Sequence, residues 1–187
     1  MAKCTICNSR KGKRNCQITN SQICSECCGP LRNAKKCEGC PFYKDEKSQR
    51  NYGQSPSIAL QEMEQNFGHQ EYTNIIESAL CKIDSDTNQA LRDAFFMRLL
   101  ELLLDKYFFN DSAAAFANPI EQEAFETIER IIREEMKNLN HQEISKYLGT
   151  IFRSVRRRNT GRRDYIEFIR EYVGVRVAPG VRMMPGL

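Results

Sequence analysis

The chain has 187 residues, of which 41% are hydrophobic and 28% charged, with a net charge of +4 and no tryptophan. This length suits one main domain with a small additional module, and the apolar fraction is sufficient for a hydrophobic core. No run approaches the ~20 apolar residues of a membrane helix, and no apolar block follows the first positive charges, which excludes a typical secretory signal. We therefore expect a cytoplasmic protein without membrane contact.

The charge is unevenly distributed along the chain. Residues 1–52 hold 11 Lys/Arg against 4 Asp/Glu, residues 53–152 hold 8 against 17, and residues 153–187 hold 9 against 3. Basic ends favour binding of a polyanion such as RNA or DNA. They are equally compatible with docking of the two ends on the acidic middle, so the charge pattern leaves both interpretations open.

Cysteine is concentrated at the N-terminus. Eight of the nine cysteines fall within residues 4–40, which in a reducing compartment indicates metal binding rather than a disulfide framework. Three Cys-x2-Cys pairs are present, and each can hold one ion from a tight turn, as structural zinc sites do. Together the eight supply the thiolates of two four-cysteine zinc sites, and the predicted ligands are Cys4, Cys7, Cys16, Cys24, Cys27, Cys28, Cys37 and Cys40.

The adjacent cysteines at positions 27 and 28 indicate how two ions share these ligands. Adjacent side chains in a turn point apart, so we expect each of the two to serve a different Zn²⁺. An interleaved arrangement gives one ion Cys4, Cys7, Cys24 and Cys27 and the other Cys16, Cys28, Cys37 and Cys40. A sequential arrangement, and a single zinc with spare thiols, remain open. A metal-free module is disfavoured because ~40 residues this polar lack a core.

The cysteine spacing resembles the B-box class of cross-brace zinc modules. The B-box Asp position is occupied by Thr19, a poor ligand, so Cys28 is expected to replace it, and Cys37-x2-Cys40 stands where the B-box has two histidines. The pattern is more similar to a group of uncharacterised microbial proteins with an N-terminal CxxC…C…ICxxCCG…R…CxxC motif followed by an aromatic residue. The matching residues are Cys4, Cys7, Cys16, Ile23 to Gly29, Arg32, Cys37, Cys40 and Phe42 or Tyr43. The resemblance to this group covers about 45 residues and implies zinc binding but no particular activity. The resemblance to B-boxes implies a role in protein–protein contact, by analogy alone.

Basic residues accompany the cysteines. Two four-thiolate zinc centres carry a formal charge of −4, which these residues can offset. They also form a candidate surface for nucleic acid or an acidic partner, because there are more of them than the four positive charges needed to offset the two zinc centres. The candidate nucleic-acid-binding residues of the module are Arg10, Lys11, Lys13 and Arg14.

The remainder of the chain is predicted to be helical, so the fold class is mostly α. We expect the module in residues 1–44, a linker in 45–57, an α-helical bundle of about five helices in 58–173, and a flexible tail rich in Gly and Pro in 174–187. No run shows convincing β alternation. The stripes of apolar and aromatic side chains at helical spacing are interpreted as core.

Several boundaries can be placed from local signals. A first helix begins near Ser55-Pro56 and is interrupted near Gly68. The next begins at Ser85 or Asp86 and is apolar nearly all round, which indicates a central helix or a dimer contact. Residues 111–117 form a loop, Asn118-Pro119 opens the third helix, and Asn140 opens the fourth with a capping-box-like start. The fifth follows Gly161.

Six arginines cluster at the end of the fourth predicted helix. Planar guanidinium groups bind phosphate bidentately, so this segment is a second candidate nucleic-acid surface. The alternative is structural: cations at a helix C-terminus complement the helix dipole, or pair with the glutamates of the third helix. The candidate residues are Arg153, Arg156, Arg157, Arg158, Arg162 and Arg163.

The sequence offers no recognisable catalytic set. The start of a calcium loop at Asp84 lacks the glycine and glutamate that such a loop needs, and the two histidines, His69 and His141, are not needed as ligands. Cys81 lies beside an apolar stripe and is expected in the core. We therefore predict a non-enzymatic, zinc-binding interaction protein that binds nucleic acid. The alternative is a protein–protein adaptor or homodimer.

Overall fold

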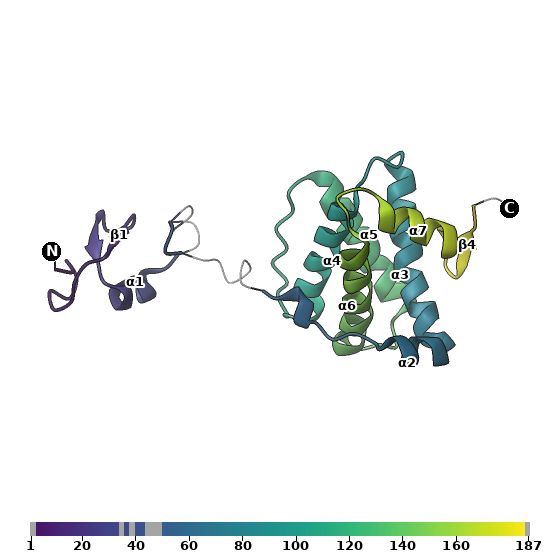
Figure 1. The fold of residues 1–187 in the computed structure, drawn as a ribbon, viewed down its shortest axis with the longest axis horizontal. Coiled ribbons are helices and arrows are strands. Elements are labelled where there is room, and N and C mark those ends of the chain that lie inside the picture. The colour runs from purple at the N-terminus through teal and green to yellow at the C-terminus, as the bar shows by residue number, and fades with distance from the viewer. Residues whose placement is uncertain (1–2, 34–35, 38–39, 44–49, 186–187) are drawn as a thin grey trace. The chain divides into compact units, whose positions relative to one another are not determined.

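The structure, a computed structural model, describes residues 3–33, 36–37, 40–43 and 50–185. The chain forms two compact units, residues 1–50 and residues 51–187 (Figure 1). The first contains the predicted cysteine module and the second is mostly helical, as the sequence predicts.

The N-terminal unit is built on a short hairpin followed by a helix. Strands β1 (Arg14–Cys16) and β2 (Ser21–Ile23) pair antiparallel, and α1 (Ser25–Leu31) follows directly. The backbone before β1 also joins the unit, through an isolated bridge between Lys3 and Lys11. These short strands were not predicted, because three residues are too few for alternation to be recognised.

The core of this unit is very small. Cys4 and Ile23 are fully buried and Cys24 nearly so. The backbone around Gly12 lies close to β2: a Cβ there would be 2.8 Å from the carbonyl oxygen of Gln22, so only glycine fits. These three residues and Cys37, the buried residues among those described in this unit, cannot offset its conformational entropy, so the unit needs cross-links of another kind.

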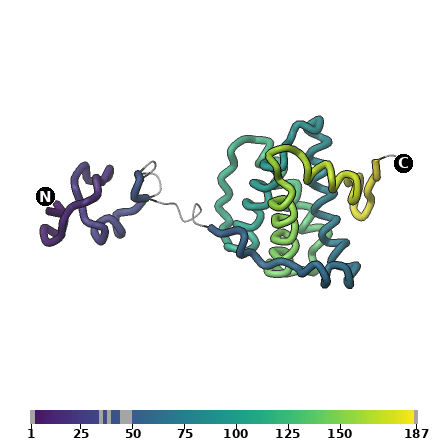
Figure 2. The backbone as a smooth tube through the Cα atoms, in the orientation of Figure 1, coloured from purple at the N-terminus to yellow at the C-terminus, as the bar shows by residue number. Residues whose placement is uncertain are grey.

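The C-terminal unit is a helical bundle with a small hairpin (Figures 1 and 2). The longest helices pack α4 against α6 and α3 against α5, while α7 and β3 lie on α3. Their apolar stripes face one core, as expected. In chain order the elements are the 3-10 helix η2 (Tyr52–Gln54), α2 (Leu60–Gln65), α3 (Phe67–Asp86), α4 (Asp93–Tyr107), α5 (Pro119–Glu135), α6 (His141–Arg158), α7 (Asp164–Tyr172), β3 (Val175–Ala178) and β4 (Val181–Met183).

Two predicted helix starts are confirmed by their caps. Asn118 accepts a hydrogen bond from the amide of Glu121 at the start of α5. At the start of α6, Asn140 and Glu143 form the reciprocal capping box. Short polar side chains before an apolar stripe are reliable markers because they satisfy amides that a helix leaves unpaired.

The predicted boundary between the first and second helices was wrong. Helix α3 continues through Asp86, which the sequence assigned to the next helix, and α4 begins only at Asp93. Asn88 and Gln89 have positive φ angles of 55° and 58°, which no right-handed helix accommodates. The break between the two helices therefore comes after Asp86, whereas the sequence placed it before Ser85 or Asp86.

Part of the predicted linker belongs to the helical unit. Residues 44–49 lie outside the described residues, but Tyr52 packs on Phe152, and its hydroxyl donates to Asp105 Oδ1 at 2.8 Å. Gly149 on α6 receives this segment: a Cβ there would lie 2.1 Å from the carbonyl oxygen of Pro56. The linker composition is thus misleading, because polar residues next to the bundle are held by contacts more than 50 positions away.

The predicted flexible tail is also corrected. Residues 175–183 form the antiparallel hairpin β3–β4. The buried Arg176 forms a two-pronged ion pair with Glu135 at the end of α5, and the amide of Gly180 donates to the same carboxylate at 3.3 Å. Gly and Pro are frequent in turns as well as in mobile tails, so composition alone did not distinguish the two.

A partly buried carboxyl group in α3 makes the stability of this unit pH-dependent. The hydroxyl of the fully buried Tyr165 donates to Glu77 Oε1 at 2.5 Å. Burial raises the pKa of Glu77 to about 7, from an ordinary value of 4.5. Between these two values the folded state binds more protons than the unfolded state, so rising pH favours unfolding.

We expect the free energy of unfolding to fall by on the order of 2 kcal/mol between pH 5 and pH 8, from this group alone. Urea denaturation at both pH values measures it. The variant Glu77→Gln keeps an acceptor for Tyr165 but does not titrate, so its pH dependence should be flatter. An identical pH profile for the variant and the native chain contradicts this assignment.

Candidate metal centre and basic cleft

Four cysteines of the N-terminal unit converge on one point. Cys4 and Cys7 come from the turn before β1, Cys24 caps α1, and Cys27 lies one turn into that helix. Their sulfur atoms all lie within 4.8 Å of one another, and Cys7 and Cys24 are 3.9 Å apart. In a tetrahedral zinc site with Zn–S bonds of ~2.3 Å, sulfurs lie about 3.8 Å apart. These four cysteines are therefore close enough to hold one metal ion.

The local backbone produces this convergence. Asn8 adopts a left-handed conformation, with φ of 52°, and its amide donates to the carbonyl of Cys4 at 2.9 Å. This closes the Cys-x2-Cys turn. Cys24 acts as the N-cap of α1, with its sulfur accepting from the amide of Cys27 at 3.5 Å. A turn and a helix start thus present their pairs of sulfurs to the same point.

The thiols of this cluster titrate differently. Hydrogen bonds from the Ser9 hydroxyl and from backbone amides lower the pKa of Cys7 to about 5. The amide of Cys7 chiefly lowers the pKa of Cys4. By contrast, a hydrogen bond shared with the sulfur of Cys24 raises the pKa of Cys27 to about 12. Because metals bind thiolates, an ion in this cluster would displace the proton of Cys27 at neutral pH.

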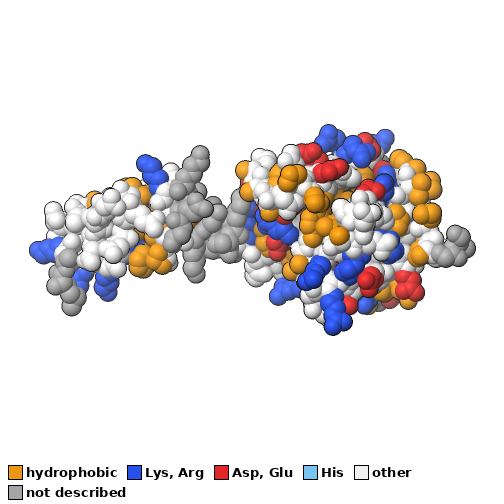
Figure 3. Space-filling view, turned by 90° about the horizontal axis from the view of Figure 1, so that it is seen from above, with side chains coloured by type: hydrophobic (Ala, Val, Ile, Leu, Met, Phe, Trp, Pro, Cys, Tyr) orange, Lys and Arg blue, Asp and Glu red, His pale blue; other side chains and the backbone are white. Residues whose placement is uncertain are grey.

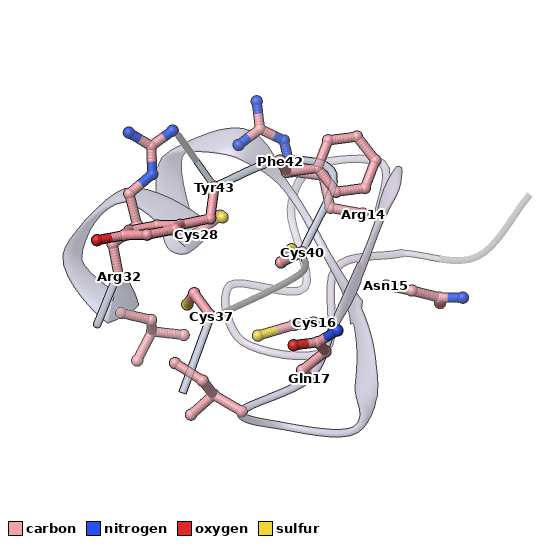
Figure 4. A pocket seen from close by; sticks show the side chains of 12 residues that line it. Arg14, Asn15, Cys16, Gln17, Cys28, Arg32, Cys37, Cys40, Phe42 and Tyr43 are labelled. Atoms are coloured by element: carbon pink, nitrogen blue, oxygen red, sulfur yellow. The ribbon is translucent and has the colours of Figure 1, made fainter. Parts of the chain in front are cut away.

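The other four cysteines of the module line one small cavity between β1, α1 and the segment carrying Cys37 and Cys40 (Figure 4). Its volume is about 10 Å³, which is room for a single water-sized occupant. The remaining lining includes Arg14, Arg32 and Phe42. Among the described residues, no second cluster as tight as the first is found. The four cysteines are Cys16, Cys28, Cys37 and Cys40.

The adjacent cysteines thus face different sites. Cys27 belongs to the tight cluster, while Cys28 lines the cavity. The grouping of the tight cluster is the one that the interleaved arrangement predicts, and it excludes a sequential one in which Cys16 joins the first site. Thr19, at the B-box Asp position, is exposed, and its hydroxyl hydrogen-bonds Cys16, lowering that thiol's pKa.

A basic cleft lies on the same unit. Its volume is about 570 Å³, and Lys11 and Lys13 on its wall are exposed. The guanidinium of Arg14 lies over the ring of Phe42, 5.2 Å from its centroid. Figure 3 shows Lys and Arg side chains beside hydrophobic ones on this unit. The cleft is lined by Arg10, Lys11, Lys13, Arg14, Cys24, Ser25 and Phe42, which include all four basic residues predicted for the module.

Two of the six clustered arginines have roles within the helical unit. Arg153 donates to the carbonyl oxygens of Gly53 and Ser55 at 3.0 and 2.6 Å. Arg163 forms a two-pronged ion pair with the buried Asp84, at 3.0 and 2.9 Å. The structural alternative is therefore realised for this ion pair, although the partner lies on α3 rather than on the glutamate-rich helix α5.

The other four arginines are exposed. Arg158 stacks over the ring of Phe168, 3.8 Å from its centroid, and Arg157 donates weakly to Ser154 at 3.5 Å. Arg156 and Arg162 are exposed as well. In the described part of the helical unit, none of these four forms an ion pair, so their charges remain available to a ligand.

Cys81 and the two histidines belong to the helical unit. Cys81 is fully buried in the helical core, as expected, and burial raises its pKa to about 12. His69 is only partly exposed, because it bonds the hydroxyl of Tyr147 at 2.9 Å, while His141 is exposed against the ring of Tyr107.

Sequence reasoning missed two features. Asp84 was considered only as part of a calcium loop, yet it is the buried partner of Arg163 and Arg170. The available sequence signal for its burial was that Asp84 directly follows Ile83, which belongs to an apolar stripe. The aromatic residue after the last cysteine, Phe42, was noted only as part of the spacing pattern, and its place in the basic cleft had no sequence signal.

No family model, no curated protein and no solved structure matches the chain. Within the described ranges, no helix has the length and hydropathy that a membrane span requires. Functional assignment therefore depends on the cysteine sites and the basic cleft themselves.

Proposed function

We propose that the chain is a non-enzymatic, metal-organised interaction protein that binds nucleic acid through the basic cleft of its N-terminal unit. The observation that carries this proposal is the composition of the cleft: the side chains that line it include four cations and no carboxylate. Phosphodiester backbones are recognised mainly by such clustered Lys and Arg side chains.

The metal in this proposal is zinc, in two structural sites. The tight cluster binds the first ion, and the cavity lined by the other four cysteines binds the second. Sulfur ligands and tetrahedral spacing favour zinc over harder cations. The small core supports a structural role, because the hairpin and α1 have little else to hold them together. As in the cross-brace modules that this spacing resembles, the metals would fix the surface that carries the cleft.

The exposed arginines of the helical unit form a secondary part of the proposed interface. Arg156, Arg157, Arg158 and Arg162 have exposed charge, whereas Arg153 and Arg163 are used to hold the fold. We therefore expect substitutions at Arg157 or Arg162 to weaken binding modestly. Substitution of Arg153 or Arg163 should instead lower stability.

Salt dependence tests the nucleic-acid proposal. With three phosphate contacts, because Arg10 is paired with Glu26, affinity for a short RNA or DNA should fall about 20- to 40-fold between 50 and 200 mM salt. Fluorescence anisotropy with a labelled oligonucleotide measures this. The double variant Lys11→Ala/Lys13→Ala should bind more weakly and with a smaller salt slope. Lys137→Ala/Lys146→Ala, which removes two exposed lysines from the helical unit, is the matched control. Absence of binding at low salt rules the proposal out.

A protein–protein role is the second candidate, and it has a separate observation in its favour. Leu60 and Phe67, on either side of the break between α2 and α3, are 76% and 84% exposed. Light scattering tests self-association through Leu60 and Phe67. A dimer that the variant Phe67→Ser dissociates supports this role. A protein that is monomeric at all concentrations contradicts self-association through Leu60 and Phe67.

A further inference from the structure

The basic cleft combines charge with one aromatic ring. Phe42 is 39% exposed at its wall, so part of the ring is accessible to a ligand. Duplex nucleic acid offers phosphates to such a surface, but its bases are stacked on one another. Only an unpaired base can lie against a protein ring, and base–aromatic stacking beside cations is how single strands are bound without a fixed sequence.

The guanidinium of Arg14 gives a second, independent indication of a ligand. One terminal nitrogen of this group, Nη1, is buried and has no hydrogen-bond partner among the described residues. Buried donors are normally satisfied, because an unpaired one costs free energy. Stacking over the Phe42 ring supplies no oxygen acceptor for this N–H. The side chain as a whole is only partly buried, so a rotation of the guanidinium toward a ligand oxygen beside that ring would complete the site. A phosphate flanking a stacked base supplies this acceptor.

The remaining cations extend the site along a strand. Lys11 and Lys13 alternate along the segment entering β1, both exposed, and Arg10 is paired with Glu26 on α1. Two free lysines together with Arg14 suit two or three consecutive phosphates. An acidic or phosphorylated peptide would satisfy these cations equally well, but it would not use the exposed face of Phe42.

From these observations we propose that the cleft binds single-stranded nucleic acid, with one base stacked on Phe42 and its phosphate on Arg14. This inference rests on the proposed function and deepens it by naming the class of nucleic acid. It predicts that the single strand binds about 5- to 100-fold more tightly than a duplex of the same sequence. It also predicts that a strand with abasic sites, which retains all its phosphates, binds as weakly as the duplex.

The variant Phe42→Leu tests the stacked base. It should lower affinity for the single strand by about 5- to 100-fold, leave the salt slope unchanged, and leave binding of the abasic strand unchanged. Phe42→Tyr should restore stacking. Phe67→Leu, which alters a far more exposed phenylalanine in the other unit, is the matched control. Metal content by elemental analysis confirms that each variant keeps its module.

A fluorescent variant reports the same contact directly. The chain has no tryptophan and 7 tyrosines, so Phe42→Trp introduces a single indole that can be excited selectively at the red edge of the absorption band. A stacked base should quench its fluorescence, while an abasic strand should not. Equal binding of duplex, single strand and abasic strand would overturn the stacking inference and leave nucleic-acid binding intact. Binding only of an acidic phosphopeptide, or of none of the probes, would remove both.

Discussion

Replacing Cys24 with serine is expected to unfold the N-terminal unit while the helical unit stays folded. Cys24 combines two roles, because its sulfur belongs to the tight cluster and also caps α1. A structural zinc site contributes roughly 10–16 kcal/mol in small peptides, far more than the few buried residues described in this unit provide. Chelation of the metal at neutral pH should have the same effect. NMR spectra should lose the dispersed signals of the N-terminal unit and keep those of the helical unit.

The ninth cysteine provides the matched control for this experiment. Cys81 is buried in the core of the other unit, so Cys81→Ala should leave metal stoichiometry unchanged. Elemental analysis and native mass spectrometry report how many ions are lost in each variant. Native protein without stoichiometric metal, or an N-terminal unit that keeps its shape after chelation, would refute the structural role of the metal.

Replacing Asp84 with alanine should be the most damaging single change in the helical unit. This carboxylate is fully buried, and it accepts from Arg163 at 3.0 and 2.9 Å and from Arg170 at 2.6 Å. Its removal leaves two guanidinium groups without their partner, which costs about 3–5 kcal/mol for a buried pair. For a unit of this size we expect the melting temperature to fall by roughly 10–20 °C.

Asp86, two residues further along α3, is the control for this prediction. It is exposed and pairs with Lys82 one helical turn away, and such pairs contribute only about 0.3–0.5 kcal/mol. Thermal unfolding followed by circular dichroism compares Asp84→Ala with Asp86→Ala. Equal melting temperatures for the two variants would show that the Asp84 cluster does not hold α7 to α3.

The two units obtain their stability in different ways. In the helical unit, α4 alone buries Phe96, Leu99, Leu100 and Leu103 completely, so the hydrophobic effect holds it together. In the N-terminal unit most side chains are exposed, and the cysteines take the place of a core. With the proposed metal bound, we expect that unit to be sensitive to chelators, acid and oxidants, and the helical unit to be insensitive to chelators.

The arginine segment illustrates the limit of reading function from charge. In sequence the six residues are equivalent, and all satisfy the criterion for a phosphate-binding patch. In the structure Arg153 holds the segment before α2, and Arg163 pairs with Asp84, 79 positions earlier in the chain. Only the exposed members retain charge for a partner, and exposure depends on packing rather than on local sequence.

Local sequence signals determined much of the secondary structure of this protein. The spacing of the cysteines predicted the Cys-x2-Cys turns, because each turn brings two sulfurs together through bonds close in sequence, and the interleaved arrangement was one of those it left open. That the turns of Cys4, Cys7 and of Cys24, Cys27 meet at one point was decided by the tertiary structure. Helical periodicity and the caps at Asn118 and Asn140 likewise predicted the bundle. Tertiary structure alone decided the rest: the hairpin on Glu135, the burial of Asp84, and the ring of Phe42 beside Arg14. Each of these depends on residues brought together from distant positions, and the free energy of such contacts has no counterpart in the local pattern.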